Sequence, residues 1–117
     1  MGHASAKEKD RPFVKVDWGR TMSLFGPESV GARFVRVKIT EYGPGIEHKR
    51  HRHPDQEEVI YVLEGRGISR TDAGDQPMEP GTFVFIPADT DHTTINLERD
   101  RPLKAIIIKA PPGEPER

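Results

Sequence analysis

The chain has 117 residues, a formal net charge of −1 and a hydrophobic content of 33%. This length allows one domain, and the balanced charge offers no basic surface to a nucleic-acid backbone, so we expect no nucleic-acid partner. Ile and Val far outnumber Leu, and 11 Gly and 11 Pro residues are spread along the chain. β-Branched residues separated by turn residues favour an all-β domain over a helical bundle or a membrane-spanning protein.

Both ends of the sequence differ from the middle. Residues 1–12 are small or charged, and residues 110–117 are rich in proline. We therefore expect two flexible tails around a β-barrel domain at residues 13–109. The N-terminal residues lack the apolar core of a signal peptide, and the chain has no cysteine, so we expect a cytoplasmic protein without a membrane partner.

The first part of the domain contains two weak strand candidates, residues 13–17 and 22–25, followed by a clear one at residues 33–42. In the clear strand Val35, Val37 and Ile39 alternate with polar residues. This period of two predicts that the apolar side chains form the buried face and that the polar ones face solvent.

The second part of the domain continues with short strands separated by turns. The predicted strands are residues 58–63, 67–71, 82–86, 92–97 and 103–109, with a hairpin signal at residues 72–75. Residues 58–63 and 82–86 are apolar on both faces, which is typical of strands covered on both sides. The sequence predicts an antiparallel jelly-roll or β-barrel of about eight strands with little or no helix.

Three histidines and one glutamate have a spacing that suits a metal site. His51 and His53 are two residues apart, so in extended chain they leave the same face. Glu58 shares a face with Ile60 and Val62, and His92 opens a later strand. Imidazole and carboxylate donors suit Fe, Mn, Ni, Co or Zn. A His-x-His pair alone also occurs on exposed surfaces, so this spacing leaves both interpretations open.

The residues around these donors form two longer motifs. The first reads G-x5-H-x-H-x4-E-x6-G and uses Gly45, His51, His53, Glu58 and Gly65. The second reads G-x5-P-x-D-x2-H-x3-N and uses Gly81, Pro87, Asp89, His92 and Asn96. Together they resemble the two motifs of the cupin superfamily, in particular its small single-domain members of the cupin 2 conserved-barrel type.

The resemblance covers residues 33–109 and departs from the family pattern at Asp89, where the second motif normally has glycine. Asp is one of the few other residues that tolerates left-handed backbone. By position, the resemblance implies that His51, His53, Glu58 and His92 bind one divalent transition metal per chain inside a barrel. His48 is an odd number of residues from His51, so in a regular strand it would face away from this site, and we expect a rim or surface residue.

Other residues are candidates for substrate contacts or for a subunit interface. Arg36 and Lys38 could point into the mouth of the barrel and hold a substrate carboxylate, although a solvated strand face is the simpler interpretation. Tyr61 is a further candidate substrate contact, as a proton donor. Val59, Tyr61 and Leu63 also form the second apolar face of one strand, which predicts packing against a second subunit in a homodimer.

The predicted function is that of a small metal-binding cupin acting on a small-molecule substrate that is anionic or rich in oxygen. Among the possible activities we favour an Fe(II)-dependent dioxygenase, because ligation by nitrogen and oxygen alone suits iron. The alternatives are a metal-dependent isomerase, epimerase or lyase acting on a keto-acid or sugar acid, and a non-catalytic small-molecule-binding cupin.

Overall fold

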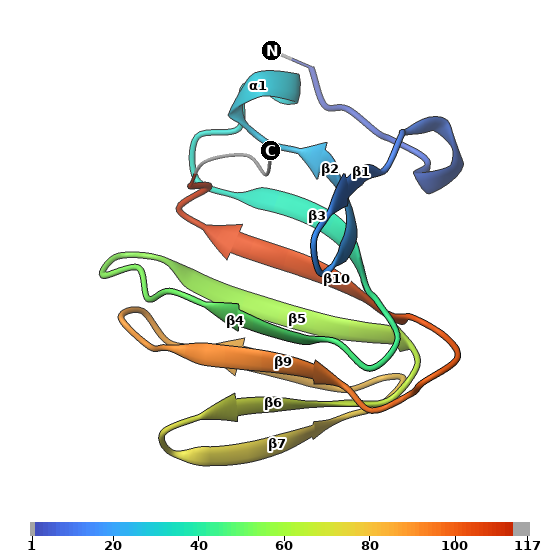
Figure 1. Ribbon diagram of the computed structural model, residues 1–117. Helices are drawn as coiled ribbons and strands as arrows, with labels where there is room; N and C mark the ends of the chain where they lie inside the picture. The colour runs from blue at the N-terminus through green and yellow to red at the C-terminus, as the bar shows by residue number, and fades with distance from the viewer. Residues whose placement is uncertain (1, 114–117) are drawn as a thin grey trace.

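The computed structural model describes residues 2–113 and contains two stacked antiparallel sheets (Figure 1). The six-stranded sheet has the order β1-β2-β3-β10-β5-β8, and the four-stranded sheet has the order β4-β9-β6-β7. The strands of the first sheet are β1 (Val14–Val16), β2 (Gly19–Phe25), β3 (Arg36–Tyr42), β5 (Glu57–Glu64), β8 (Phe83–Ile86) and β10 (Leu103–Ala110). Those of the second are β4 (Glu47–Arg50), β6 (Gly67–Thr71), β7 (Gly74–Met78) and β9 (His92–Asn96).

The all-β antiparallel barrel predicted from the sequence is confirmed. The described residues form ten strands rather than about eight, and the two unpredicted ones are β4 and β7. Both lie at the edges of the four-stranded sheet. Edge strands have one side without a backbone partner, so β4 tolerates a charged sequence and β7 tolerates Pro77.

Two short helical turns accompany the strands: η1 (Glu8–Asp10) and α1 (Pro27–Val30). In α1 a proline occupies the first turn, and Ser29 accepts a hydrogen bond from the backbone N–H of Gly26 at 3.1 Å. Gly31 ends the helix with a φ of 68°, a left-handed conformation that glycine adopts readily.

The interior of the barrel is packed with apolar side chains from both sheets. The buried cluster consists of Tyr42, Ile60, Val62, Met78, Val84, Ile86, Leu103, Ala105 and Ile107. The strand predicted to be apolar on both faces, β5, places Ile60 and Val62 in this cluster and turns Val59 and Tyr61 outward, where they are half-buried.

Strand β3 reverses the predicted assignment of its two faces. Arg36 and Lys38 are 1% and 2% exposed, so the prediction that the polar side chains of this strand face solvent is wrong. The register explains the reversal, because Lys38 pairs with Ile107 and Ile107 pairs with Ile60, and paired residues share a face. The polar row of β3 therefore points into the barrel, while Val37 and Ile39 lie on the other face of the strand, where Val37 is half-buried and Ile39 is buried.

The two predicted tails carry some structure in the residues that are described. Glu8 of η1 forms an ion pair with Lys104, and Gln56 donates a hydrogen bond to the carbonyl of Pro111 at 2.9 Å. Met1 and residues 114–117 lie outside the described residues. Within residues 2–113, no helix has both the length and the apolar character needed to cross a membrane.

Candidate metal and substrate site

A cavity of about 280 Å³ opens at the end of the barrel where β5 and β9 begin and where β4, β8 and β10 end. All four predicted metal ligands, His51, His53, Glu58 and His92, contribute to its wall. The other lining residues are His48, Lys49, Arg50, Gln56, Ile86, Pro87, Thr90 and Lys109.

Glu58 and His92 meet across the gap between the two sheets. Oε2 of Glu58 lies 2.9 Å from Nε2 of His92, and both side chains are buried. The contact lacks hydrogen-bond alignment, since Nε2 of His92 has no hydrogen-bond partner among the described residues. Nδ1 of His92 lies 3.4 Å from the carbonyl oxygen of Thr90. A carboxylate oxygen and an imidazole nitrogen this close together are two donors that can bind the same cation.

Arg50 holds the second oxygen of Glu58. Its guanidinium donates a hydrogen bond to Oε1 at 3.0 Å. Burial alone would raise the pKa of Glu58, but the neighbouring His92 and the positive charges of Arg50 and Lys109 lower it to about 2. Glu58 is therefore a carboxylate at neutral pH.

His51 and His53 lie in the loop between β4 and β5 and are exposed. They reach the cavity wall but do not converge on the Glu58–His92 pair, and residues 2–113 contain no group of three or more His, Asp or Glu side chains placed to hold a metal. The two-residue spacing places side chains on one face only in a strand, and β4 ends at Arg50. The donor types thus fit a divalent metal. Glu58 and His92 are in contact, and the imidazoles of His51 and His53 lie at the rim of the cavity.

The loop that carries these histidines is tied to the second motif. The backbone N–H of Asp89 donates to the carbonyl of His53 at 2.8 Å. Asp89 has a φ of 57°, so the aspartate that replaces the family's glycine does adopt left-handed backbone, as the sequence indicates.

The sequence predicts a rim or surface position for His48, with its side chain facing away from the site, whereas the structure places it in the cavity wall. It is half-buried, lines the cavity and stacks on Trp18 with ring centroids 4.0 Å apart. The expectation was wrong because it counted residues from His51 as though one strand ran through both. His48 and Arg50 belong to β4, whose alternate residues point inward, whereas His51 follows the end of that strand.

The three predicted substrate contacts lie away from the cavity wall. Arg36 binds α1 and the C-terminal segment, and Lys38 is buried deeper in the barrel. Tyr61 lies on the outer face of β5 and packs on Phe83 with ring centroids 4.3 Å apart.

The buried cations in the cavity wall are instead Arg50 and Lys109, which the sequence interpretation missed. The alternating pattern of β10 could have identified Lys109 as an inward-facing residue, because Lys109 shares the face of Leu103, Ala105 and Ile107.

Comparisons with known proteins agree with this architecture. The sequence pattern of the family described as "Cupin domain" matches residues 38–109. The chain is 36% identical to an uncharacterized protein, MJ1618, of Methanocaldococcus jannaschii over 107 residues, which cover 90% of this chain and 83% of that protein. It is 31% identical to the dimethylsulfoniopropionate lyase DddW of Ruegeria pomeroyi over 87 residues, or 74% of this chain and 54% of the lyase.

Among solved structures, KdgF from Halomonas sp. superposes with a TM-score of 0.82 at 15% identity, covering 94% of each chain. That likeness concerns the fold alone. Curated relatives have varied names, including a lyase, an isomerase and an oxalate-binding protein. The chain spans about half the length of the lyase that it matches.

Proposed function

This chain belongs to the cupin domain family, and we propose that it binds one divalent transition metal through His51, His53, Glu58 and His92 and acts on a small anionic molecule. The observation that carries the proposal is the buried contact between Oε2 of Glu58 and Nε2 of His92, 2.9 Å apart in the cavity wall. When bound, Fe, Mn, Ni, Co or Zn would supply a Lewis acid that polarises a carbonyl or carboxylate oxygen.

The chain's own residues prepare both donors for a cation. Arg50 occupies Oε1 of Glu58 and leaves Oε2 directed toward His92. When Nε2 of His92 binds a cation, its proton would be on Nδ1, beside the carbonyl of Thr90. The exposed loop carrying His51 and His53 brings two further imidazoles to the rim.

The charges around the cavity favour an anion as the substrate. Lys49, Arg50 and Lys109 contribute three cationic groups to the wall, and Glu58 contributes the one carboxylate among the lining residues. Arg50 and Lys109 are largely withdrawn from solvent, so their attraction for a carboxylate is weakly screened. A cavity of about 280 Å³ is at the small end of ligand sites, which suits a small oxo- or hydroxy-acid.

For the reaction class, we favour an isomerase or lyase on such an acid. Relatives named as a lyase and an isomerase support proton-transfer chemistry, and His48 provides a cavity-lining group that can carry a proton. The Fe(II)-dependent dioxygenase preferred from the sequence stays a prediction, supported by the nitrogen and oxygen donor set. A relative named as an oxalate-binding protein supports the non-catalytic alternative.

Metal content tests the central proposal. Purified protein reconstituted with Fe(II), Mn(II), Ni(II), Co(II) or Zn(II) should retain about one ion per chain, and His51→Ala, His53→Ala and His92→Ala should each lower the affinity at least tenfold. His3→Ala, in the exposed N-terminal segment, is the matched control. A folded wild-type chain that retains none of these metals would refute the proposal.

Three assays separate the possible activities. Anaerobic conversion of keto-acids or sugar acids by the metal-loaded protein would support the isomerase or lyase. Substrate-dependent oxygen uptake by the Fe(II)-loaded protein would support the dioxygenase. A small carboxylate that raises the melting temperature without being converted would support the binder.

We also propose that the chain forms a homodimer through the outer face of the six-stranded sheet. Phe83 and Phe85 are 71% and 57% exposed there, beside half-buried Val59, Tyr61 and Leu63. Sedimentation should give a dimer, which Phe83→Ser with Phe85→Ser should dissociate, whereas a wild-type monomer would contradict the proposal. The predicted cytoplasmic location is likewise a proposal, resting on the absence of cysteine.

A further inference from the structure

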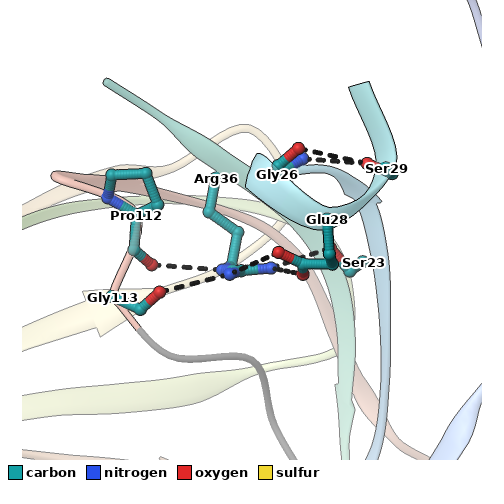
Figure 2. Close-up of polar contacts among 7 residues, drawn as sticks. All are labelled: Ser23, Gly26, Glu28, Ser29, Arg36, Pro112 and Gly113. Atoms are coloured by element: carbon teal, nitrogen blue, oxygen red, sulfur yellow. Dashed lines mark hydrogen bonds and ion pairs between the residues drawn. The ribbon is translucent and has the colours of Figure 1, made fainter. Parts of the chain in front are cut away.

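The buried guanidinium of Arg36 joins three separate parts of the chain (Figure 2). It forms a two-pronged contact with the carboxylate of Glu28 on α1, and its Nη1 also donates to Oγ of Ser23 at 3.2 Å. Its Nε donates to the carbonyl of Pro112 at 3.1 Å, and its Nη2 donates to the carbonyl of Gly113 at 3.2 Å. Arg36 thus holds the segment that follows β10, and the carboxylate of Glu28 in turn holds the guanidinium of Arg36.

The same segment is bonded to one residue of the cavity wall and directly follows another. Gln56, which lines the cavity, donates a hydrogen bond from Nε2 to the carbonyl of Pro111 at 2.9 Å. Lys109, the cavity cation on β10, lies immediately before the segment and pairs in register with both Arg36 and Glu58. Residues 110–113 therefore connect a wall residue of the cavity, Gln56, to the Arg36 anchor.

Two consecutive prolines make the segment of residues 110–113 stiff. Pro111 and Pro112 have restricted φ angles and no N–H group, so at these two positions the backbone can hydrogen-bond only through its carbonyl groups. The contacts to Gln56 and Arg36 are of this kind. Pro112 is buried, so the segment is packed as well as hydrogen-bonded.

We propose that residues 110–113 are a strap that fixes the cavity wall at Gln56 and Lys109, that Arg36 is the positioning residue that anchors it, and that its release sets how readily a small solute reaches Lys109. The proposal rests on the proposed function only in taking this cavity as the ligand site. Arg36 acts through the strap, since it does not itself line the cavity.

The reactivity of the Lys109 amine tests the strap without any metal or substrate. Metal-free, full-length protein is acetylated with a small acylating reagent, and the rate at each lysine is followed by mass spectrometry. Arg36→Met removes the anchor and should raise the rate at Lys109 about tenfold relative to the exposed Lys15. Arg20→Met, which breaks the more exposed pair with Glu41 on the same sheet, is the matched control and should leave the ratio unchanged.

A second variant keeps the test decisive if Arg36→Met does not fold. Pro111→Gly with Pro112→Gly leaves Arg36 and Glu28 in place but loosens the strap, so the ratio of rates should rise several-fold. A ratio equal to wild type in this variant would overturn the strap. Co(II) titration of the same proteins separates the two proposals: a wild type that binds no metal refutes the metal site, while the lysine rates still decide the strap.

Discussion

The two ends of the barrel interior differ in chemistry although the same strands run through both. At the packed end, Tyr42 and Leu103 face each other across β3 and β10, and both are fully buried. At the cavity end, the same two strands and β5 place Arg36, Lys109 and Glu58 side by side. The six-residue step along β10 separates the two rows by about 20 Å at ~3.3 Å per residue.

This difference shows how one β-barrel can carry both a core and a polar site. Backbone pairing does not depend on which side chain points inward, so the chemistry of the interior can change from one row to the next. The apolar rows stabilise the fold. At the cavity end, charged side chains pair with one another, as Arg50 of β4 does with Glu58 of β5. Substitutions at the two ends should therefore have different consequences.

The largest effect on stability is expected at the packed end. Leu103→Ala removes a fully buried side chain from the core cluster and should lower the free energy of unfolding by about 4 kcal/mol. Urea denaturation measures this loss. Co(II) bound per folded chain should stay unchanged, and a matching loss of metal affinity would show that the two ends are not independent.

At the cavity end, the expected signature is a dependence on pH. The pKa of Glu58 is lowered from 4.5 to about 2 in the folded chain, so its contribution to stability is fully present above about pH 4.5 and is lost as the pH falls through about 2. The contribution is on the order of 3 kcal/mol at most. Urea denaturation of metal-free wild type and Glu58→Gln from pH 7 to pH 2 should show a stability difference that shrinks with acid.

A difference between these two proteins that stays constant over that range would contradict the assignment of the pKa shift to Glu58. Glu57→Gln provides the control, because this neighbour is exposed and its removal should leave the pH profile of stability unchanged.

The smallest effect is expected between the two ends. Ile107 precedes Lys109 by two residues on the same inward face of β10, and it pairs with Lys38 and Ile60. Ile107→Val deletes one methylene group and should cost about 1 kcal/mol in urea denaturation. A cost as large as that of Leu103→Ala would mean that the apolar packing continues undiminished to the rim of the cavity.

Much of the fold could be predicted because strand periodicity is a local signal. The strands around Ile60, Val84 and Ile107 were all located from their apolar patterns. Strands β4 and β7 were missed because edge strands need neither apolar faces nor a full set of backbone partners. The inward direction of Arg36 and Lys38 was missed because alternation identifies two faces but not which of them closes the barrel.

The motif spacing alone named four donor residues and the family to which the chain belongs. Only the tertiary structure decided which donors meet: Glu58 and His92 come from different sheets, so their contact depends on how the sheets pack. The same packing turned His48, Arg50 and Lys109 toward the cavity. Local sequence determines the conformation of each strand, whereas the relation between strands depends on burial and pairing across the whole chain.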